Sequence, residues 1–367
     1  MSRAQELTDA LRRIGERPAG SDTERRAAVW AATQLRQRPR QPPVIETLWL
    51  RPHWAAAQAI NITIAVTGSL IASSQPRVGA AVILLGLLSL IADATLDTSL
   101  GRLLTPERAT QNVLSPAPQE RQVRLILTAN LDTARIDPDH QGWLPGWVAL
   151  TAGLTLWLLL SAIAQLEGDR SLLIAVLQIV PTVALIGVAT WLTLGLRRVD
   201  NAEGVATVLA LTRLLDVSPP AHIAVDVLLT GAGSAGSGLT RHLRAHRRER
   251  TVTNTVVLGI GPGPGAYYLI SDGPLLIAGF FARLRALAAA TGRLEARRGR
   301  GVSPALPARR RGLPALSIGG EPDELISAAL ELIDAIDADV GEVQARAAAG
   351  AGRRWSAKRA RARIRQG

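Results

Sequence analysis

The chain has 367 residues, of which 47% are hydrophobic, and its formal net charge of +12 reflects 42 Lys and Arg against 30 Asp and Glu. It contains no cysteine, which excludes disulfides, thiolate metal sites and cysteine nucleophiles. The basic balance suits contact with anionic surfaces, either lipid or nucleic acid. Residues 1–20 are charged and lack an apolar core, so we expect no cleavable signal peptide.

Residues 1–50 are expected to form the first part of a lobe outside the membrane. Apolar residues at helical spacing predict helices over 4–16 and 21–38, separated by a Pro-Ala-Gly turn. Ser21 and Glu24 have the spacing of a capping box, in which side chains satisfy free N–H groups at a helix start. A proline-rich segment then ends this helical part.

Two long apolar segments, 54–98 and 143–198, predict two transmembrane helical hairpins. Their apolar runs are Trp54–Ser73, Val78–Ala92, Trp147–Gln165 and Leu172–Leu196. Each run is near the ~20 residues that a helix needs to cross a bilayer, although the second run is short. No charge interrupts the runs of the second hairpin, whereas a buried helical pair stays open as an alternative for the first.

The lobe is expected to continue in residues 99–142 and 199–348, so that the hairpins interrupt it twice. A buried-strand pattern covers Val123–Ala129, and a helix begins at Asp200, which has the capping-box spacing with Glu203. Further strands are predicted over 222–229, 254–260, 266–271 and 313–318, and helices over 235–248, 274–291 and 322–347. This alternation predicts an α/β fold with a mainly parallel sheet.

Arginines gather on the lobe side of the apolar runs, at Arg36, Arg38, Arg40, Arg51, Arg102, Arg108, Arg197 and Arg198. The opposite turns carry only Arg77 and Arg170. By the positive-inside rule we expect a multi-pass protein of the cell membrane whose lobe and both termini are cytoplasmic. Residues 349–367 form a basic tail that we expect to bind an anionic membrane surface, and no specific nucleic acid is expected as a partner. Its cations include Arg353, Arg354, Lys358, Arg359 and Arg361.

Three segments follow a predicted strand or begin a helix: Ala129-Asn130-Leu131-Asp132, Asp200-Asn201-Ala202-Glu203-Gly204-Val205-Ala206 and Thr230-Gly231-Ala232-Gly233-Ser234-Ala235-Gly236-Ser237. In order and spacing they resemble the motifs of the two-zinc aminopeptidases, metallopeptidase family 28. The resemblance implies an aminopeptidase-like α/β/α sandwich, here interrupted by the two hairpins. It also implies that Asp200 stands where the family's aspartate bridges two zinc ions.

The same resemblance shows that most of the family's metal ligands are replaced. Asn130 stands in a histidine position, and Thr230 and Gly231 stand where a general base and a zinc ligand belong. Asp132 matches an aspartate that only orients the histidine, which leaves Asp200 as the one matching metal ligand. We therefore predict a vestigial cleft with no catalytic residue and no cofactor, and less than stoichiometric zinc. Zinc is implied only if the resemblance is functional.

The predicted function is a membrane-anchored pseudo-enzyme that binds or scaffolds a peptide, a lipid headgroup or a protein partner. One alternative is an active zinc-dependent exopeptidase with ligands that the motifs do not identify. Another is a nucleotide-binding membrane protein that uses the Gly231 loop, because Gly231-x-Gly233-x-x-Gly236 follows a predicted strand and begins a helix. Against it, the next strand ends at Gly259-Ile260-Gly261, without an acidic residue for a ribose.

Other polar residues have simpler structural interpretations. His242 and His246 lie four apart on a predicted helix, a spacing compatible with a zinc pair, but the surrounding arginines favour a solvated basic face. His140 is interpreted as part of a polar loop beside the membrane. Asp93 lies near the end of an apolar run, where snorkelling or a role at the helix end is the simplest explanation.

Overall fold

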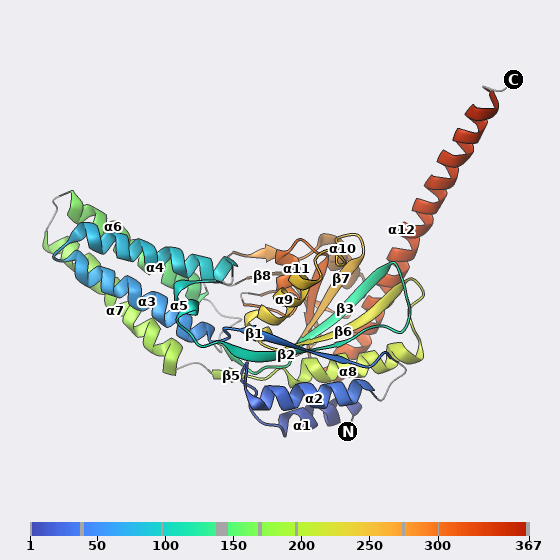
Figure 1. Ribbon diagram of the computed structural model, residues 1–367, viewed down its shortest axis with the longest axis horizontal. Coiled ribbons are helices and arrows are strands. Elements are labelled where there is room, and N and C mark those ends of the chain that lie inside the picture. The colour runs from blue at the N-terminus through green and yellow to red at the C-terminus, as the bar shows by residue number, and fades with distance from the viewer. Residues whose placement is uncertain are drawn as a thin grey trace.

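The computed structural model describes residues 2–36, 40–96, 98–136, 146–167, 171–194, 197–273, 276–299 and 301–364. Figure 1 shows three parts: a bundle of long helices at one end, a lobe built on a twisted sheet, and a C-terminal helix that leaves the lobe on the side away from the bundle. The predicted loop that contains His140 and the ends of several turns lie outside the described residues.

Within the described residues, a nine-stranded sheet has the order β1-β2-β6-β3-β7-β11-β8-β10, with β9 paired to β8. The strands are β1 (Val44–Leu50), β2 (Arg108–Ser115), β3 (Val123–Asn130), β6 (Ile223–Thr230), β7 (Thr255–Gly261), β8 (Tyr267–Asp272), β9 (Ala278–Gly279), β10 (Glu295–Arg298) and β11 (Ala315–Gly319). The β6-β3-β7-β11 block is parallel, but the β1–β2, β2–β6 and β11–β8 pairs are antiparallel. The β8–β10 pair at the other end of the sheet is parallel. The sheet is therefore mixed, and the prediction of a mainly parallel sheet is wrong for the antiparallel pairs.

Each helical hairpin is the connection between two antiparallel strands: the first joins β1 and β2 of the nine-stranded sheet, and the second joins the strands of a separate two-stranded sheet. β1 leads into the first hairpin and β2 follows it, so that Leu50 pairs with Arg108 at the base. In the same way β4 (Ala134–Ile136) and β5 (Arg197–Val199) pair across the base of the second hairpin. An out-and-back connection returns the chain in the opposite direction, which is the arrangement that antiparallel pairing requires.

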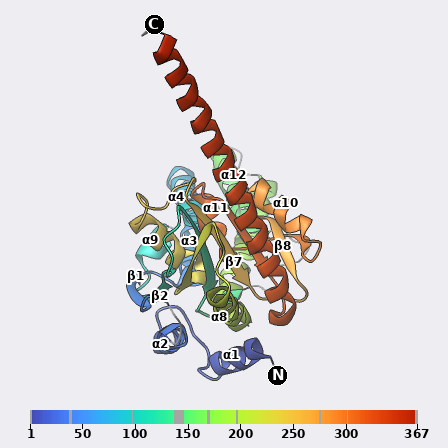
Figure 2. The same cartoon turned by 90° about the vertical axis from the view of Figure 1, so that its right-hand side faces the viewer.

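Helices cover both faces of the sheet. In Figure 1, α1 (Arg3–Arg12), α2 (Asp22–Arg36) and α8 (Ala202–Val217) lie below the sheet, and α9 (Ser237–Ala245) and α11 (Leu306–Arg310) lie above it. The helix expected over 274–291 is α10 (Ala282–Ala290), which starts later because β9 pairs with β8 first. The helix expected over 322–347 is α12 (Pro322–Ile364), which packs against α8 and then extends beyond the lobe (Figure 2).

The bundle contains α3 (Trp54–Ala72), α4 (Pro76–Leu96), α6 (Trp147–Leu166) and α7 (Leu172–Leu194), which are long and apolar enough to cross a membrane. The short helix α5 (Leu100–Leu103) follows α4. Helices α3 and α4 approach closely, since a Cβ on Gly79 would lie 2.4 Å from the Cα of Ala72. Large apolar side chains such as Leu160 and Val183 face outward. An outward apolar surface of this kind suggests membrane association.

Candidate functional site

The motif residues at the ends of β3 and β6 meet at one edge of the sheet. Asn130 and Thr230 are register partners, and Thr230 Oγ1 donates to Asn130 Oδ1 at 3.2 Å. The N–H of Gly231 donates to Asn112 Oδ1 on β2 at 3.1 Å. A Cβ at Gly231 would lie 2.3 Å from Thr110 Oγ1, so β2 closes the space that a larger side chain at this position would need.

The loop after β6 directs its N–H groups toward two buried carboxylates. Asp132 Oδ1 accepts from the N–H of Gly233 at 2.7 Å and from that of Ser234 at 3.2 Å. Glu24 Oε1 accepts from the N–H of Ala232 at 2.9 Å, and Ala232 has a left-handed φ of +47°. Successive inward N–H groups are the usual anion-binding feature of a glycine-rich loop. Here the anions are side chains of the protein itself.

Glu24 lies on α2 and is almost fully buried. Its carboxylate also accepts from the N–H of Gly20 at 2.6 Å and from Thr110 Oγ1 at 2.8 Å. Burial, together with the charge of Asp132, raises the pKa of Glu24 to about 7. Burial also raises the pKa of Asp132. Half of the predicted capping box forms, since Ser21 Oγ accepts from the N–H of Glu24 at 3.1 Å, but the Glu24 carboxylate reaches the loop after β6.

A guanidinium group binds Asp200, the one residue that matches a family metal ligand. The side chain of Arg17 is only 1% exposed and forms an ion pair with Asp200 Oδ1. Arg17 also donates to the carbonyl oxygens of Leu131 at 2.9 Å and Gly15 at 2.9 Å. Arg12 approaches the other carboxylate oxygen of Asp200 at 3.7 Å. Two cations of the protein therefore surround the carboxylate that would have to bind zinc.

The capping box predicted for Asp200 and Glu203 is divided between two partners. Asp200 Oδ1 accepts from the N–H of Ala202, the first residue of α8, at 3.0 Å. Glu203 Oε1 instead accepts from Arg12 Nη2 at 2.7 Å. The carboxylate of Glu203 does not complete the predicted capping box because α1 packs against α8 and brings Arg12 to the start of α8.

The structure thus brings Asn130, Asp132, Thr230 and Gly231 together, and Asp200 reaches this edge through Arg17. Whether the five line a ligand cleft stays a prediction. The motif analysis did not include Arg17, Glu24 and Asn112 in this cluster, although Arg17 and Glu24 flank the predicted turn before the second helix. An amide, a hydroxyl, a glycine and a carboxylate already paired with arginine do not fit a zinc site.

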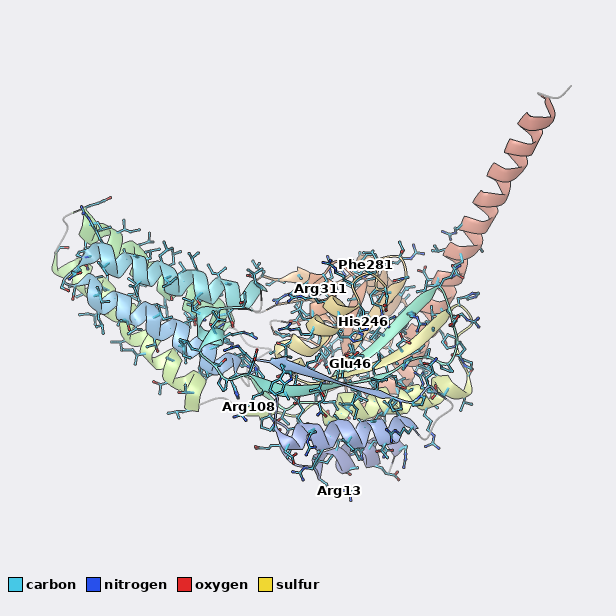
Figure 3. All side chains as sticks on the ribbon, in the orientation of Figure 1. Arg13, Glu46, Arg108, His246, Phe281 and Arg311 are labelled. Atoms are coloured by element: carbon cyan, nitrogen blue, oxygen red, sulfur yellow. The ribbon has the colours of Figure 1, made fainter. Side chains whose placement is uncertain are left out.

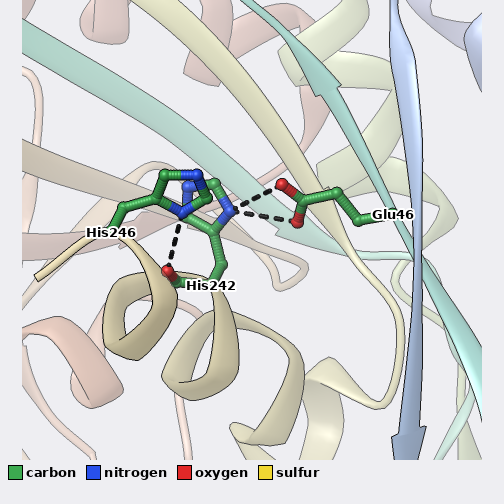
Figure 4. Close-up of side chains that lie close together, drawn as sticks. All are labelled: Glu46, His242 and His246. Atoms are coloured by element: carbon green, nitrogen blue, oxygen red, sulfur yellow. Dashed lines mark hydrogen bonds and ion pairs between the residues drawn. The ribbon is translucent and has the colours of Figure 1, made fainter.

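A second polar cluster lies between α9 and the edge strand β1 (Figures 3 and 4). His242 Nδ1 lies 3.0 Å from Glu46 Oε2, and the rings of His242 and His246 stack with their centroids 4.4 Å apart. Although burial acts to raise it, the pKa of Glu46 is lowered by the hydrogen bond and charge of His242. His242 is only 1% exposed, so the predicted solvated basic face is wrong for His242, whereas His246 is partly exposed. Arg241 and Arg244 of α9 are exposed, and His242 occupies the inner face of the helix.

Asp93 is buried near the end of α4, and its contacts with the segment just after this helix match the predicted role at the helix end. It forms an ion pair with Arg102 Nε at 2.6 Å and accepts from Ser99 Oγ at 2.9 Å, and Gln58 on α3 also donates to it. Ser99 and Arg102 belong to the segment around α5, which follows the first hairpin. This network therefore holds that segment against the helices of the first hairpin.

Comparison with known proteins gives distant structural similarities. No protein-family model matches the chain, and no curated protein matches it. The zinc aminopeptidase of Bacillus subtilis is 13% identical with a TM-score of 0.45, over 91% of this chain and 94% of that one. Fimbriiglobus ruber glutaminyl cyclase is 12% identical with a TM-score of 0.45, over 92% and 93% of the two chains. A leucine aminopeptidase precursor from Bacteroides thetaiotaomicron is 11% identical with a TM-score of 0.43, over 92% and 94%. These values do not assign the chain to a family.

Proposed function

We propose that this chain is a membrane-anchored binding or scaffolding protein with an aminopeptidase-like lobe and no zinc peptidase activity. The observation that carries the proposal is the buried ion pair between Arg17 and Asp200. A zinc ion at Asp200 would have to displace or sit beside this guanidinium. The zinc ion and the guanidinium would repel each other in this partly buried site, which opposes metal binding. Asn130, Thr230 and Gly231 offer no second charged ligand that could compensate for this repulsion.

The two alternative functions have less support from the same contacts. An exopeptidase needs a group that takes a proton from metal-bound water, and Thr230 and Gly231 cannot do so near neutral pH. A nucleotide would need the N–H groups of the loop after β6 for its phosphates. Glu24 and Asp132 already accept from those N–H groups, so a phosphate would have to displace both carboxyl groups.

The proposed partner of the basic tail is an anionic membrane surface. Residues 349–367 carry six arginines and one lysine next to Trp355, and each cation near an anionic leaflet contributes about 1 kcal/mol. In Figure 1, α12 extends beyond the lobe on the side away from the bundle of long helices. A peptide of residues 349–367 should bind anionic vesicles in a salt-sensitive way. Equal binding to neutral vesicles would contradict this partner.

The test of the missing activity uses tag-free full-length protein in detergent. We expect no cleavage of aminoacyl or dipeptide substrates after addition of zinc, cobalt or manganese, and no binding in titrations with NAD or ATP. Asp200→Asn is the matched variant, because asparagine can still accept from the N–H of Ala202 but loses the charge that zinc requires. Peptidase activity that Asp200→Asn abolishes would overturn the proposal.

A further inference from the structure

We propose that His242 and His246 bind one divalent transition-metal ion, with zinc the best fit, and that Glu46 on edge strand β1 orients His242 for the ion. One donor atom from each of the three residues can be chosen so that all three atoms lie within 4.8 Å of one another. Imidazole nitrogen is a ligand that zinc prefers, and a carboxylate on the second ring nitrogen is a usual partner of a metal-bound histidine. Around one tetrahedral zinc, two imidazole nitrogens lie roughly 3.3–3.6 Å apart, and water would complete the coordination.

The ring of His246 is oriented as a metal ligand usually is. Its Nδ1 lies 3.0 Å from the main-chain carbonyl oxygen of His242 (Figure 4). A carbonyl oxygen only accepts, so Nδ1 carries the proton and Nε2 keeps its lone pair. A hydrogen bond from the second ring nitrogen to a carbonyl oxygen is the contact that fixes metal-binding histidines in the required tautomer.

His242 has the corresponding arrangement with a carboxylate in place of the carbonyl oxygen. Its Nδ1 lies 3.0 Å from Glu46 Oε2, whereas its Nε2 is buried and has no hydrogen-bond partner among the described residues. With the proton on Nδ1, Nε2 offers a free lone pair inside the protein. A buried polar atom without a partner is costly, and a metal ion at Nε2 would supply the missing partner. Glu46 then orients His242 and contributes negative charge beside the ion.

The arginines of this region do not exclude a cation from the cluster. Those at 241, 244, 247 and 248 are exposed, where water and salt screen their charge. Arg250 is neutralised in part by an ion pair with Asp226 at 3.1 Å. Glu46 is the acidic group in direct contact with the ring of His242.

The hydrogen bond between Glu46 and a metal-bound His242 would join segments that are nearly two hundred residues apart in the chain. β1 is the terminal strand of the sheet, and within it Glu46 lies four residues before the end at Leu50, which leads into α3. α9 begins after the loop that contains Gly231. With the ion on His242, this hydrogen bond would hold the strand that enters the first hairpin against the lobe.

The test measures zinc binding to tag-free, EDTA-treated full-length protein by elemental analysis, with cobalt absorption as a second readout. We expect one zinc per chain at saturation. His246→Asn should weaken zinc binding by at least about 100-fold, and Glu46→Gln by about 10–100-fold, as loss of an orienting carboxylate does. His246 is partly exposed, so its variant retains a folded protein even if a variant of the buried His242 does not.

Two controls separate this site from others. His222→Asn removes an exposed histidine outside the cluster and should leave zinc binding unchanged. Asp200→Asn should also leave it unchanged, which separates the site from the strand-end motifs and makes this inference independent of the proposed function. Absence of zinc binding in the parent protein, or equal binding in His246→Asn and the parent protein, would overturn the site. Unchanged affinity in Glu46→Gln would remove Glu46 from it.

Discussion

Replacing Arg17 by methionine tests whether a guanidinium holds the strand-end cluster together. Methionine keeps most of the volume of the side chain but removes the charge and every N–H donor. Asp200 loses its buried partner, and the carbonyl oxygens of Leu131, Gly15 and Leu11 lose their donors from this side chain. The free energy of unfolding should therefore fall.

The expected size of the loss follows from the burial of the pair. Removal of one partner from a buried ion pair costs about 3–5 kcal/mol. The side chain of Asp200 is 28% exposed and keeps Arg12 nearby, so water and a second cation partly compensate the freed carboxylate. We expect a loss near the lower end, about 3 kcal/mol, which corresponds to a fall of about 6–12 °C in the unfolding midpoint of a domain of this size.

The assay is thermal unfolding of the detergent-solubilised protein followed by tryptophan fluorescence, with Asp200→Asn and the double variant measured beside it. Asp200→Asn alone should cost less, about 1–2 kcal/mol, because Arg17 keeps its carbonyl acceptors and asparagine still accepts from Ala202. The double variant should be more stable than the sum of the single losses predicts, by about 1–3 kcal/mol. A midpoint for Arg17→Met within 2 °C of the parent protein, or strictly additive losses, would refute the reasoning.

Three further predictions concern the pH dependence of the lobe, the bundle and the topology. The pKa of Glu24 is about 7 in the folded state, against an ordinary value of 4.5. The free energy of unfolding should therefore fall as the pH rises from 4.5 to 7, because the folded state binds this proton more tightly than the unfolded state does. Glu24→Gln should reduce this dependence on pH. Asp93→Ala should remove the buried ion pair with Arg102 and lower the unfolding midpoint measured by tryptophan fluorescence, while Asp93→Asn should lower it less. Reporter fusions after Arg198 should be cytoplasmic and those at Gly168 external.

Each of these predictions has a clear contrary outcome. A stability that rises between pH 5 and 7 would show that Glu24 is ionised in the folded state across this range. Equal midpoints for Asp93→Ala and the parent protein would show that the ion pair does not hold the bundle. An external reporter after Arg198 would show that the arginine asymmetry does not set the sidedness.

The elements predicted most accurately from the sequence are those formed by continuous runs of apolar residues. The apolar runs agree with the four long helices of the bundle to within a few residues at most of their ends, and the run that ends at Ala129 agrees with β3 to within one residue. β2 was missed because polar side chains occupy buried positions within it, as Thr110 and Asn112 illustrate, so that it lacks the apolar pattern of a buried strand. Its pairing partner β1 also lies across a helical hairpin, which no local pattern reveals.

In the cluster at the strand ends, the sequence predicted only the contacts that follow directly from the pairing of neighbouring strands. The register of β3 with β6 places Asn130 beside Thr230, and both positions were named from motifs. The contacts of Arg17 and Glu24 depend on how the first two helices pack below the sheet, and periodicity gives no information about that packing. For the same reason His242 was assigned to a solvated face, since its partner Glu46 lies on a strand that was not predicted.

The position of β6 between β2 and β3 has a consequence for biogenesis. β2 and β3 are consecutive in the chain but do not pair with each other, and every residue of β6 is buried. During synthesis, β2 and β3 therefore leave the ribosome before the second hairpin and wait with open edges until residues 223–230 arrive. Exposed strand edges of this kind invite aggregation, and the lobe can complete its sheet only after the second hairpin and β6 have been synthesised.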